Sequence, residues 1–327
     1  MNKSLLRGQG PKIHLHRAIA YIHTHVRVQE FCHRRSWHLW QLRRPPILER
    51  QDGWNGQRSR RPHPPGTFVT AATGDCGAIY SPVIRQGSKT TIEGDAKVVA
   101  VDYSNKESIK NALTGVDVVI CTISRTALDL QAGIAAAAKE AGVKLFIPSE
   151  FGNVSEGETQ GMFGQKAGIQ TELKTLDIPC TNFYTGPFAD KIWAPFLDLD
   201  VRSGKVTIGG NGNKQISFTS RADIARYVSY VLTRLPAEQL NNRSFMIAGD
   251  NKSFNDIFKG FEVKTGRKVE VTYVPISEFD ARLAANPNDL PALLHKFFAT
   301  AGPFPKTDNH LYPDWNPSLV LDHVPVS

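Results

Sequence analysis

Residues 116–123 read VDVVICTI, a nearly continuous apolar run with several β-branched side chains. Such a run is typical of a strand that is buried on both faces of a parallel sheet. A helical stretch rich in Ala and Leu follows at 127–141, and residues 144–148, KLFIP, form a second apolar run. The order strand, helix, strand predicts right-handed βαβ units, and therefore an α/β protein with a doubly wound parallel sheet.

The same alternation extends to both sides of this stretch. Residues 97–103 (KVVAVDY) predict a strand upstream, and residues 162–176 and 180–184 predict a helix and a strand downstream. Residues 221–235 have a strongly amphipathic pattern, which predicts a helix with Ser220 as its N-cap. No Gly/Ser-rich linker interrupts the pattern, so we expect one compact unit.

The net positive charge is concentrated at one end of the chain. The 327 residues include 39 Lys+Arg and 31 Asp+Glu, a net charge of +8. Residues 1–66 hold 13 of the basic and 3 of the acidic residues, which leaves residues 67–327 with a net charge of −2. The basic segment permits an Arg-rich targeting segment or a nucleic-acid arm. The nearly neutral remainder makes nucleic acid an unlikely partner for the body of the protein.

Composition excludes several classes of protein. The chain is not collagenous, of low complexity or disulfide-framed. It has no run of about 18 apolar residues, so we expect no membrane span. Its four cysteines form no CxxC pair, so we expect no metal site and a reducing, cytoplasmic compartment.

Candidate functional groups follow three of the predicted strands. A doubly wound sheet binds its ligands at the carboxyl ends of its strands, which here are residues 122–124, 148–152 and 185–188. Lys166 lies on the helix between the last two, where its ammonium group can reach the same cleft. The alternative reading of Lys166 is a solvated helix lysine, and spacing alone does not decide between the two.

Four motifs occur in a fixed order: PSEFG (148–152), FGQKAGIQTEL (163–173), IPCTNFYTGPF (178–188) and DIARYV (223–228). In this order and spacing they resemble the isoflavone-reductase-like branch of the NmrA-like proteins. These are atypical short-chain dehydrogenases with a Rossmann-like fold that bind NADP(H). The resemblance is clearest over about 97–248.

The resemblance implies roles for individual residues. It places a catalytic lysine at the last position of an F-x-x-K motif, which is Lys166 here. A partly desolvated lysine can manage one proton beside a hydride transfer, because burial brings its pKa toward neutrality. A smaller C-terminal lobe, from about residue 187, is expected to complete the substrate pocket with Phe188. The residues expected to bind the cofactor at the strand ends are Thr122, Ser124, Pro148 and Phe151.

The glycine turn that such a family requires is missing from its expected place. Glycines let the backbone approach a pyrophosphate at a helix N-terminus. The nearest candidate, ATGDCG at 72–77, follows a short predicted strand at 67–70. Only 28 residues separate Gly74 from Asp102, too few for a helix, a second strand and a third strand. We therefore expect the first βα unit to be absent from the chain as written.

A shifted reading frame offers an explanation. Tryptophan has the single codon TGG, so reading one base later turns Trp37 and Trp40 into glycines, and Arg35 can become a third, giving GxGxxG. Leaving that frame at Gly66 and rejoining at Gly87 removes two bases and twenty codons, 62 bases in all, which restores the written frame.

The hypothesis divides the chain into segments. Residues 1–66 are an irregular basic segment, with 1–24 an untranslated leader and 25–65 the true first βαβ half read in the wrong frame. Residues 67–86 are a retained intron. Residues 87–327 form the NmrA-like NAD(P)-binding domain with its C-terminal lobe.

Basic residues after the second strand favour NADP(H) over NAD. In the family, such residues bind the 2′-phosphate, and Arg85 and Lys89 stand at that place with no acidic residue beside them. The proposed splice removes Arg85 itself but can restore an Arg-Gln pair before Gly87 from the shifted codons of Pro64 and Pro65. A solvated loop is the alternative reading of both side chains.

Taken together, these observations predict an NADP(H)-dependent reductase that acts on a small aromatic or conjugated carbonyl compound, with cofactor binding impaired in the chain as written. Gln170 stands where the plant reductases tend to carry arginine, which leaves the substrate open. The alternative is a non-catalytic, dinucleotide-sensing regulator of the NmrA type, which would bind a protein partner.

Overall fold

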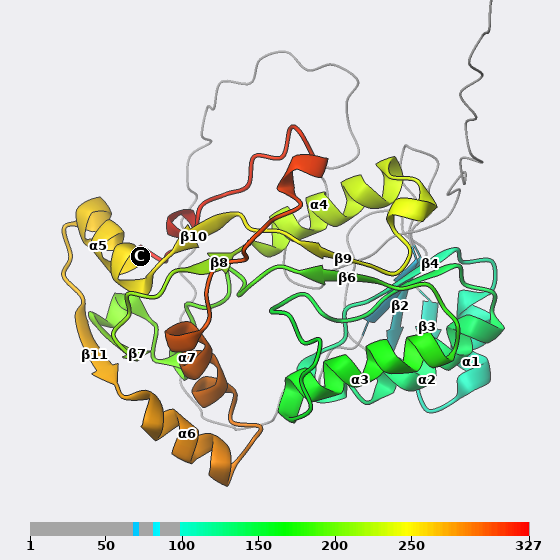
Figure 1. The fold of residues 1–327 in the computed structure, drawn as a ribbon, viewed down its shortest axis with the longest axis horizontal. Helices are drawn as coiled ribbons and strands as arrows, with labels where there is room; N and C mark the ends of the chain where they lie inside the picture. The colour runs from blue at the N-terminus through cyan, green and yellow to red at the C-terminus, as the bar shows by residue number, and fades with distance from the viewer. Residues whose placement is uncertain (1–67, 72–80, 86–98, 327) are drawn as a thin grey trace, which may run out of the picture.

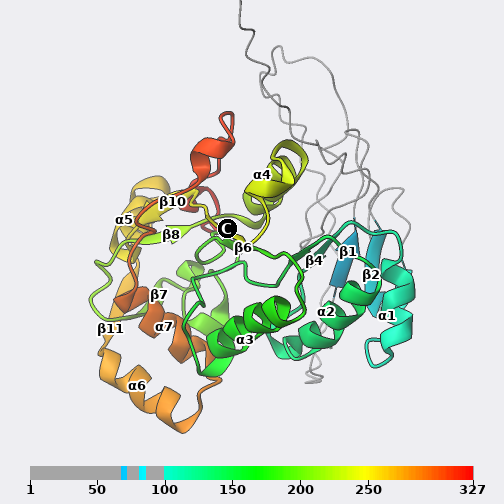
Figure 2. The same cartoon turned by 45° about the vertical axis from the view of Figure 1, so that its right-hand side comes forward.

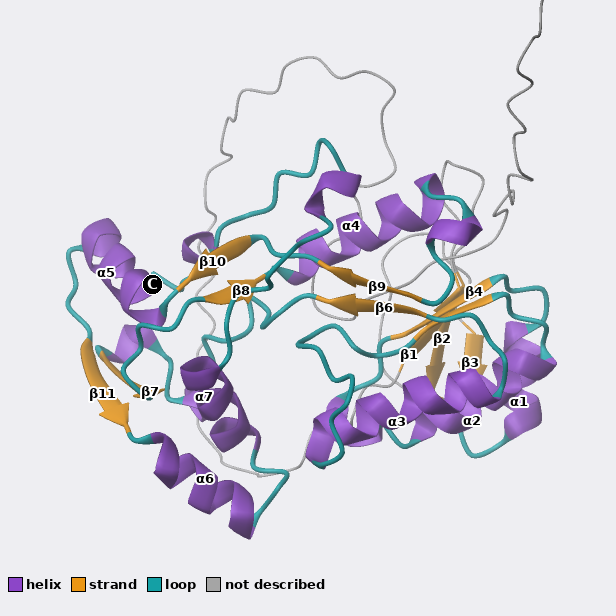
Figure 3. Ribbon diagram, in the orientation of Figure 1, coloured by secondary structure: helices purple, strands orange, loops and turns teal. Residues whose placement is uncertain are grey.

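Residues 68–71, 81–85 and 99–326 are described by a computed structural model of the chain. In this part of the chain a sheet and its covering helices form one side of the molecule, and a lobe of helices and short strands forms the other (Figure 1). The tail of the chain runs from the lobe toward the sheet side and then returns to the lobe, where the C-terminus lies (Figure 1). Figure 3 shows the same division by secondary structure.

The central sheet has the strand order β3-β2-β1-β4-β5. Its strands and the helices that follow them are β1 (Phe68–Ala71), β2 (Ser81–Arg85), β3 (Val99–Val101), α1 (Lys106–Leu113), β4 (Val118–Cys121), α2 (Leu130–Glu140), β5 (Leu145–Ile147) and α3 (Gly161–Thr175). A parallel bridge from Phe146 to Cys180 continues the sheet toward β6 (Thr181–Tyr184), which pairs in parallel with β9 (Arg243–Met246). This arrangement confirms the predicted Rossmann-like α/β fold.

The apolar runs of the sequence form the most buried strands. All four residues of β4 and all three of β5 are buried, and the two strands are parallel. Helices α1, α2 and α3 cover one face of the sheet, and α4 (Arg221–Arg234) covers the other (Figure 2). Ser220 caps α4 as predicted, because its hydroxyl accepts a hydrogen bond from the Asp223 amide at 3.1 Å.

One strand departs from the parallel arrangement. β1 lies between β2 and β4 but runs antiparallel to both. Only nine residues, 72–80, connect β1 to β2. A parallel crossover needs a dozen or more residues, so this connection permits only an antiparallel pair. β1 therefore ends at the amino edge of its neighbours, and the candidate glycines of 72–77 lie outside the described residues.

The C-terminal part of the chain builds a lobe and also completes the sheet side. The lobe consists of β7 (Lys205–Gly209), β8 (Ile216–Phe218), β10 (Asp250–Lys252), α5 (Phe254–Thr265), β11 (Glu270–Val274), α6 (Ile276–Ala285) and α7 (Leu290–Thr300). However, α4 and β9 return to the sheet, where Ile224, Val228 and Phe245 join the core around Ile120. The residues that follow the expected boundary near 187 thus do not all lie in one lobe. α4 and β9 lie on the sheet side instead, because the apolar face of the sheet there must be covered.

The tail of the chain ties β9 and α4 together. Asp308 pairs with Arg243 at 2.8 Å and accepts a hydrogen bond from the Met246 amide at 3.0 Å. Its carbonyl accepts a hydrogen bond from the buried Tyr227 hydroxyl at 2.6 Å. Trp315 then packs edge-on against Tyr227 and closes the core on the α4 side.

Two further features concern the described residues only. None of their helices combines the length and the apolar character needed to cross a bilayer. No three of their His, Cys, Asp or Glu side chains are grouped as metal ligands would be.

Candidate active site

A cavity of about 630 Å³ opens where the strands β4, β5 and β6 end and the lobe begins. Its volume is in the range of small-molecule sites. Five of the residues predicted from the sequence line it together: Thr122, Ser124, Phe151, Lys166 and Phe188. The structure therefore brings these five predicted residues together at the carboxyl ends of three strands.

Three predicted cofactor residues do not line this cavity. Pro148 is buried behind it, and its carbonyl accepts a hydrogen bond from the Glu150 amide at 2.7 Å, which turns the chain at the end of β5. Arg85 is the last residue of β2, beside Val101 of the parallel strand β3, so it lies at the carboxyl edge of the sheet. Lys89 falls outside the described residues.

A buried glutamine joins the ends of β4 and β5. The Gln131 carboxamide oxygen accepts a hydrogen bond from the Ser149 amide at 2.8 Å. The Ser149 hydroxyl in turn donates to the carbonyl of Ile123 at 2.9 Å. These bonds hold the two strand ends at a fixed separation, which is the requirement for a preorganised site.

The PSEFG turn has an unusual backbone. Phe151 has a φ of 27°, which non-glycine residues rarely adopt, and strain of this kind is concentrated at functional sites. The next carbonyl, that of Gly152, accepts hydrogen bonds from the amides of Thr185 at 2.8 Å and Gly186 at 3.0 Å. The turn after β5 is thereby fastened to the turn after β6.

Gly186 is required at that junction. Its φ is 66°, and a Cβ atom built on it would lie 1.9 Å from the carbonyl oxygen of Ser217. No side chain fits without moving the backbone of β8. The close approach brings Phe188 and the lobe against the strand ends.

Lys166 lies on α3 with its side chain in the cavity wall. The residue is only 7% exposed, and its ammonium group donates a hydrogen bond to the carbonyl oxygen of Glu150. Burial lowers the pKa of Lys166 from the ordinary lysine value, and the nearby Glu150 carboxylate partly opposes this shift. The arrangement gives the site a cation that is able to give up a proton more easily than a solvated lysine.

A buried polar network lies behind Lys166. Glu150 is 1% exposed, and both of its carboxylate oxygens accept from the Ser155 hydroxyl at 2.9 Å. The Gln170 amide donates to the same carboxylate at 2.7 Å and contacts the Tyr184 hydroxyl at 3.3 Å. The network fixes Glu150, whose carbonyl holds the lysine.

This network was missed in the sequence. Glu150 was visible inside PSEFG and Gln170 as a departure from arginine, but no motif joins either of them to Ser155. A short polar stretch between a strand end and a helix was the available signal, and it does not specify which side chains turn inward.

The lobe supplies the opposite wall of the cavity. Phe196, Leu290 and Leu294 line it from segments far along the chain. Arg221, at the start of α4, also lines it and pairs with Asp190 at 2.6 Å. Sequence reasoning missed these residues because their separation from the strand ends, by up to 170 positions, leaves no periodic signal.

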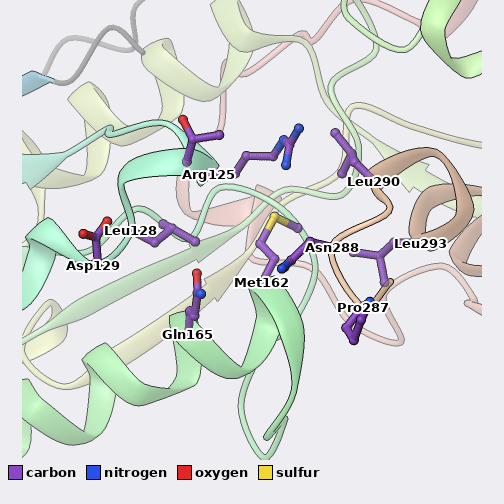
Figure 4. Close-up of a pocket in the computed structure, with 10 residues that line it drawn as sticks. Arg125, Leu128, Asp129, Met162, Gln165, Pro287, Asn288, Leu290 and Leu293 are labelled. Carbon is purple, nitrogen blue, oxygen red and sulfur yellow. The ribbon is translucent and has the colours of Figure 1, made fainter. Parts of the chain in front are cut away.

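A smaller hollow of about 360 Å³ adjoins the cavity (Figure 4). It shares Arg125, Leu128, Met162 and Leu290 with the larger one. In Figure 4 the Arg125 side chain extends above Met162 in the direction of Leu290. The two hollows are therefore parts of one depression between the strand ends and α7.

Comparison with known proteins agrees with this geometry. Phenylcoumaran benzylic ether reductase POP1 of Populus trichocarpa is 32% identical over 235 residues, which are 64% of this chain and 74% of the relative. Isoflavone reductase of Glycine max is 34% identical over 211 residues, 59% of this chain and 64% of the relative. The solved structure of AtPrR2 with NADP+ and (+)pinoresinol matches with a TM-score of 0.60 and 25% identity, covering 70% of this chain and 81% of that one. The family profile described as NmrA-like matches residues 68–312. Because that match spans well over half of the sequence, the chain belongs to the NmrA-like family.

Proposed function

We propose that the protein is an NADP(H)-dependent reductase of the isoflavone-reductase-like type, acting on a small aromatic or conjugated carbonyl compound in the cytoplasm. The observation that carries the proposal is the buried ammonium of Lys166 in a cavity at the carboxyl ends of β4, β5 and β6. Relatives named as phenylcoumaran benzylic ether reductase and isoflavone reductase support the reaction class. The AtPrR2 structure, which holds NADP+, supports the cofactor.

The described residues fit this cofactor in part. Thr122, Ser124 and Phe151 line the cavity where a nicotinamide would lie, and Arg85 ends β2 at the edge where a 2′-phosphate would lie. β1 lies between β2 and β4 in the sheet but runs antiparallel to β4. The carboxyl end of β1 is therefore at the opposite edge, and no described strand at this position leads into a helix N-terminus that could bind the pyrophosphate. The proposal therefore assigns both ends of an NADP(H) site to described residues, and it finds no pyrophosphate turn in the described part of the chain.

Lys166 has a defined task in the proposed reaction. When bound, NADPH supplies a hydride to an electrophilic carbon of the substrate. The Lys166 ammonium group donates the proton to the oxygen that gains negative charge. The Glu150 carbonyl holds the ammonium group in place, and the apolar lobe wall with Phe188 excludes water from the reacting atoms.

The reading-frame hypothesis completes the proposal. We propose that residues 1–66 and 67–86 replace a true first βαβ half, and that the chain as written binds NADP(H) weakly for this reason. The antiparallel direction of β1 supports this view, because a spliced product with a GxGxxG turn would need a parallel first strand.

The test compares Lys166→Ala with its parent in the product of the re-spliced gene. We expect turnover of a conjugated carbonyl compound to fall by about 10²–10⁴, the usual contribution of a general acid. The Kd for NADPH is expected to stay the same. Lys174→Ala, an exposed lysine on the same helix, is the matched control and should retain full activity.

A parent protein that binds NADPH and turns over no carbonyl compound would instead support the alternative, a dinucleotide-sensing regulator with a protein partner. Unchanged turnover in Lys166→Ala would refute the role of this lysine.

A further inference from the structure

The charges around the cavity do not balance. Four basic side chains line it, and one acidic side chain, Glu150, accompanies them; the basic residues are Arg125, Lys166, Lys191 and Arg221. Asp190 neutralises Arg221, and the Glu150 carbonyl and carboxylate lie beside Lys166. Arg125 and Lys191 remain, and both are exposed.

Neither of these two cations has a partner among residues 99–326. No described acidic group lies within ion-pair distance of Arg125 or Lys191, although twelve other pairs occur in this part of the chain. The carboxyl group nearest to Arg125 in sequence is that of Asp129, which in Figure 4 lies on the far side of Leu128. As far as the described part of the chain extends, the positive charge at the cavity is thus available to a ligand.

The two cations flank the cavity. Arg125 begins the short helix after β4 and lines both hollows. Lys191 follows the turn after β6, where its amide donates to the Phe188 carbonyl at 2.9 Å. A ligand between the ends of these strands would therefore meet positive charge on both sides.

Aromatic side chains line the same cavity. Phe163, Phe188 and Phe196 contribute to its wall, and Phe196 is 55% exposed. An exposed phenyl ring at the rim of a cavity gains stability when a flat apolar group covers it, by stacking and by burial of apolar area.

We propose that the natural substrate carries an aryl carboxylate in addition to its reducible carbonyl group; its ring packs against Phe188 and Phe196, and its carboxylate binds Arg125. The planar guanidinium group offers two parallel N–H donors to the two oxygens of a carboxylate. Lys191 adds positive potential on the opposite side. This inference rests on the proposed function, because it names the substrate class of the same site.

The test measures binding to the full 327-residue chain by calorimetry. The two probes are 4-hydroxycinnamate and 4-hydroxycinnamyl alcohol, which share the ring and the side-chain length and differ in charge. We expect the acid to bind about tenfold more tightly than the alcohol, which corresponds to about one charge-assisted hydrogen-bonded contact. Raising the salt concentration should reduce this preference, since the cations are exposed.

Charge-removing variants locate the contact. Arg125→Gln should abolish the preference for the acid, and Lys191→Gln should reduce it by about threefold, as for a more distant charge. Both should leave the affinity for the alcohol unchanged. Lys174→Gln removes an exposed positive charge from α3 outside the cavity lining and is expected to have no effect. Circular dichroism of each variant verifies that it is folded.

Equal affinity for the two probes, including no measurable binding of either, would overturn the inference, as would a preference that survives Arg125→Gln. The reductase proposal fails separately. If the re-spliced product prefers the acid but shows no turnover, the carboxylate site is supported and the reductase proposal is refuted. If it turns over neutral carbonyl compounds without preferring the acid, the reductase proposal is supported and the carboxylate site is refuted.

Discussion

The strand pair β1–β2 and the strand pair β4–β5 differ in direction, and the difference comes from the length of chain between the strands. β4 and β5 are joined through α2 and run parallel, with every residue buried. β1 and β2 are joined by nine residues and run antiparallel. Both pairs occupy the positions that a doubly wound sheet prescribes, in the order β3-β2-β1-β4-β5.

A strand can therefore occupy the expected position in the sheet without contributing residues to the binding site at the carboxyl edge. A strand that fills the central place contributes to the carboxyl edge only when it points toward that edge. The β4 and β5 ends bring Ser124, Phe151 and Glu150 to the cavity, whereas β1 enters the sheet at that edge and ends at the opposite one. The predictions below test this contrast, from the largest effect to the smallest.

The largest effect is expected for NADPH affinity. We expect the re-spliced product to bind NADPH with micromolar affinity and the 327-residue chain to bind it about 10³-fold more weakly, since the backbone donors of a glycine turn and a helix N-terminus would be gained together. Fluorescence titration of the two purified proteins gives both constants. Micromolar binding by the 327-residue chain would show that the direction of β1 does not matter for the cofactor.

The next largest effect is on stability at the junction of β6 with the lobe. Gly186→Ala should lower the free energy of unfolding by about 4 kcal/mol, since the added Cβ overlaps the Ser217 carbonyl at a positive φ. Urea denaturation measures the change. Gly204→Ala is the control, because Gly204 has a similar φ of 74° and open space around it, so about 1 kcal/mol is expected there. Equal losses in the two variants would refute a steric requirement at Gly186.

A smaller effect is expected in the network behind Lys166. Gln170→Glu places a second carboxylate against the buried Glu150 and should lower the free energy of unfolding by about 3 kcal/mol at pH 8. The loss should shrink in acid, because protonation of the introduced carboxyl group removes the repulsion. Thr171→Glu, at the exposed neighbouring position, controls for charge on α3. A pH-independent loss would rule out repulsion as the cause.

The smallest effect concerns the lobe wall. His295 is buried, its Nε2 is 2.9 Å from the Leu197 carbonyl, and burial lowers the pKa of His295. Below about pH 6.5, the ordinary histidine value, the unfolded chain therefore binds a proton that the folded chain resists, so stability should fall as the pH drops through this range.

Thermal denaturation between pH 8 and pH 5 measures this dependence. His295→Gln, which keeps a donor for the Leu197 carbonyl, should flatten it, and His310→Gln, at an exposed position, should not. If thermal stability depends on pH equally steeply in the parent and in His295→Gln, His295 is not the cause of the dependence.

The sequence predicted those parts of the fold that local pattern controls. The apolar runs at 116–123 and 144–148 contain the buried parallel strands Val118–Cys121 and Leu145–Ile147, and the helices predicted at 162–176 and 221–235 occur as Gly161–Thr175 and Arg221–Arg234. The direction of β1 was not predicted, because it depends on the length of a connection and not on residue type.

The site shows the same limit. Lys166 and the strand ends were found because motifs place them at fixed offsets from turns. Arg125, Lys191 and Phe196 were not, because their importance comes from what the lobe leaves unpaired or uncovered around them. Such properties depend on segments that meet only after folding.

The contacts of Asp308 and Trp315 also set an order of events during synthesis. Tyr227 and Phe245 pack under residues that leave the ribosome some 70 to 90 positions later. Until then, a nascent chain presents the apolar surface of α4 and β9 around these rings. A chaperone that binds such surfaces would therefore find its target on the partly made protein and lose it once the tail has bound α4 and β9.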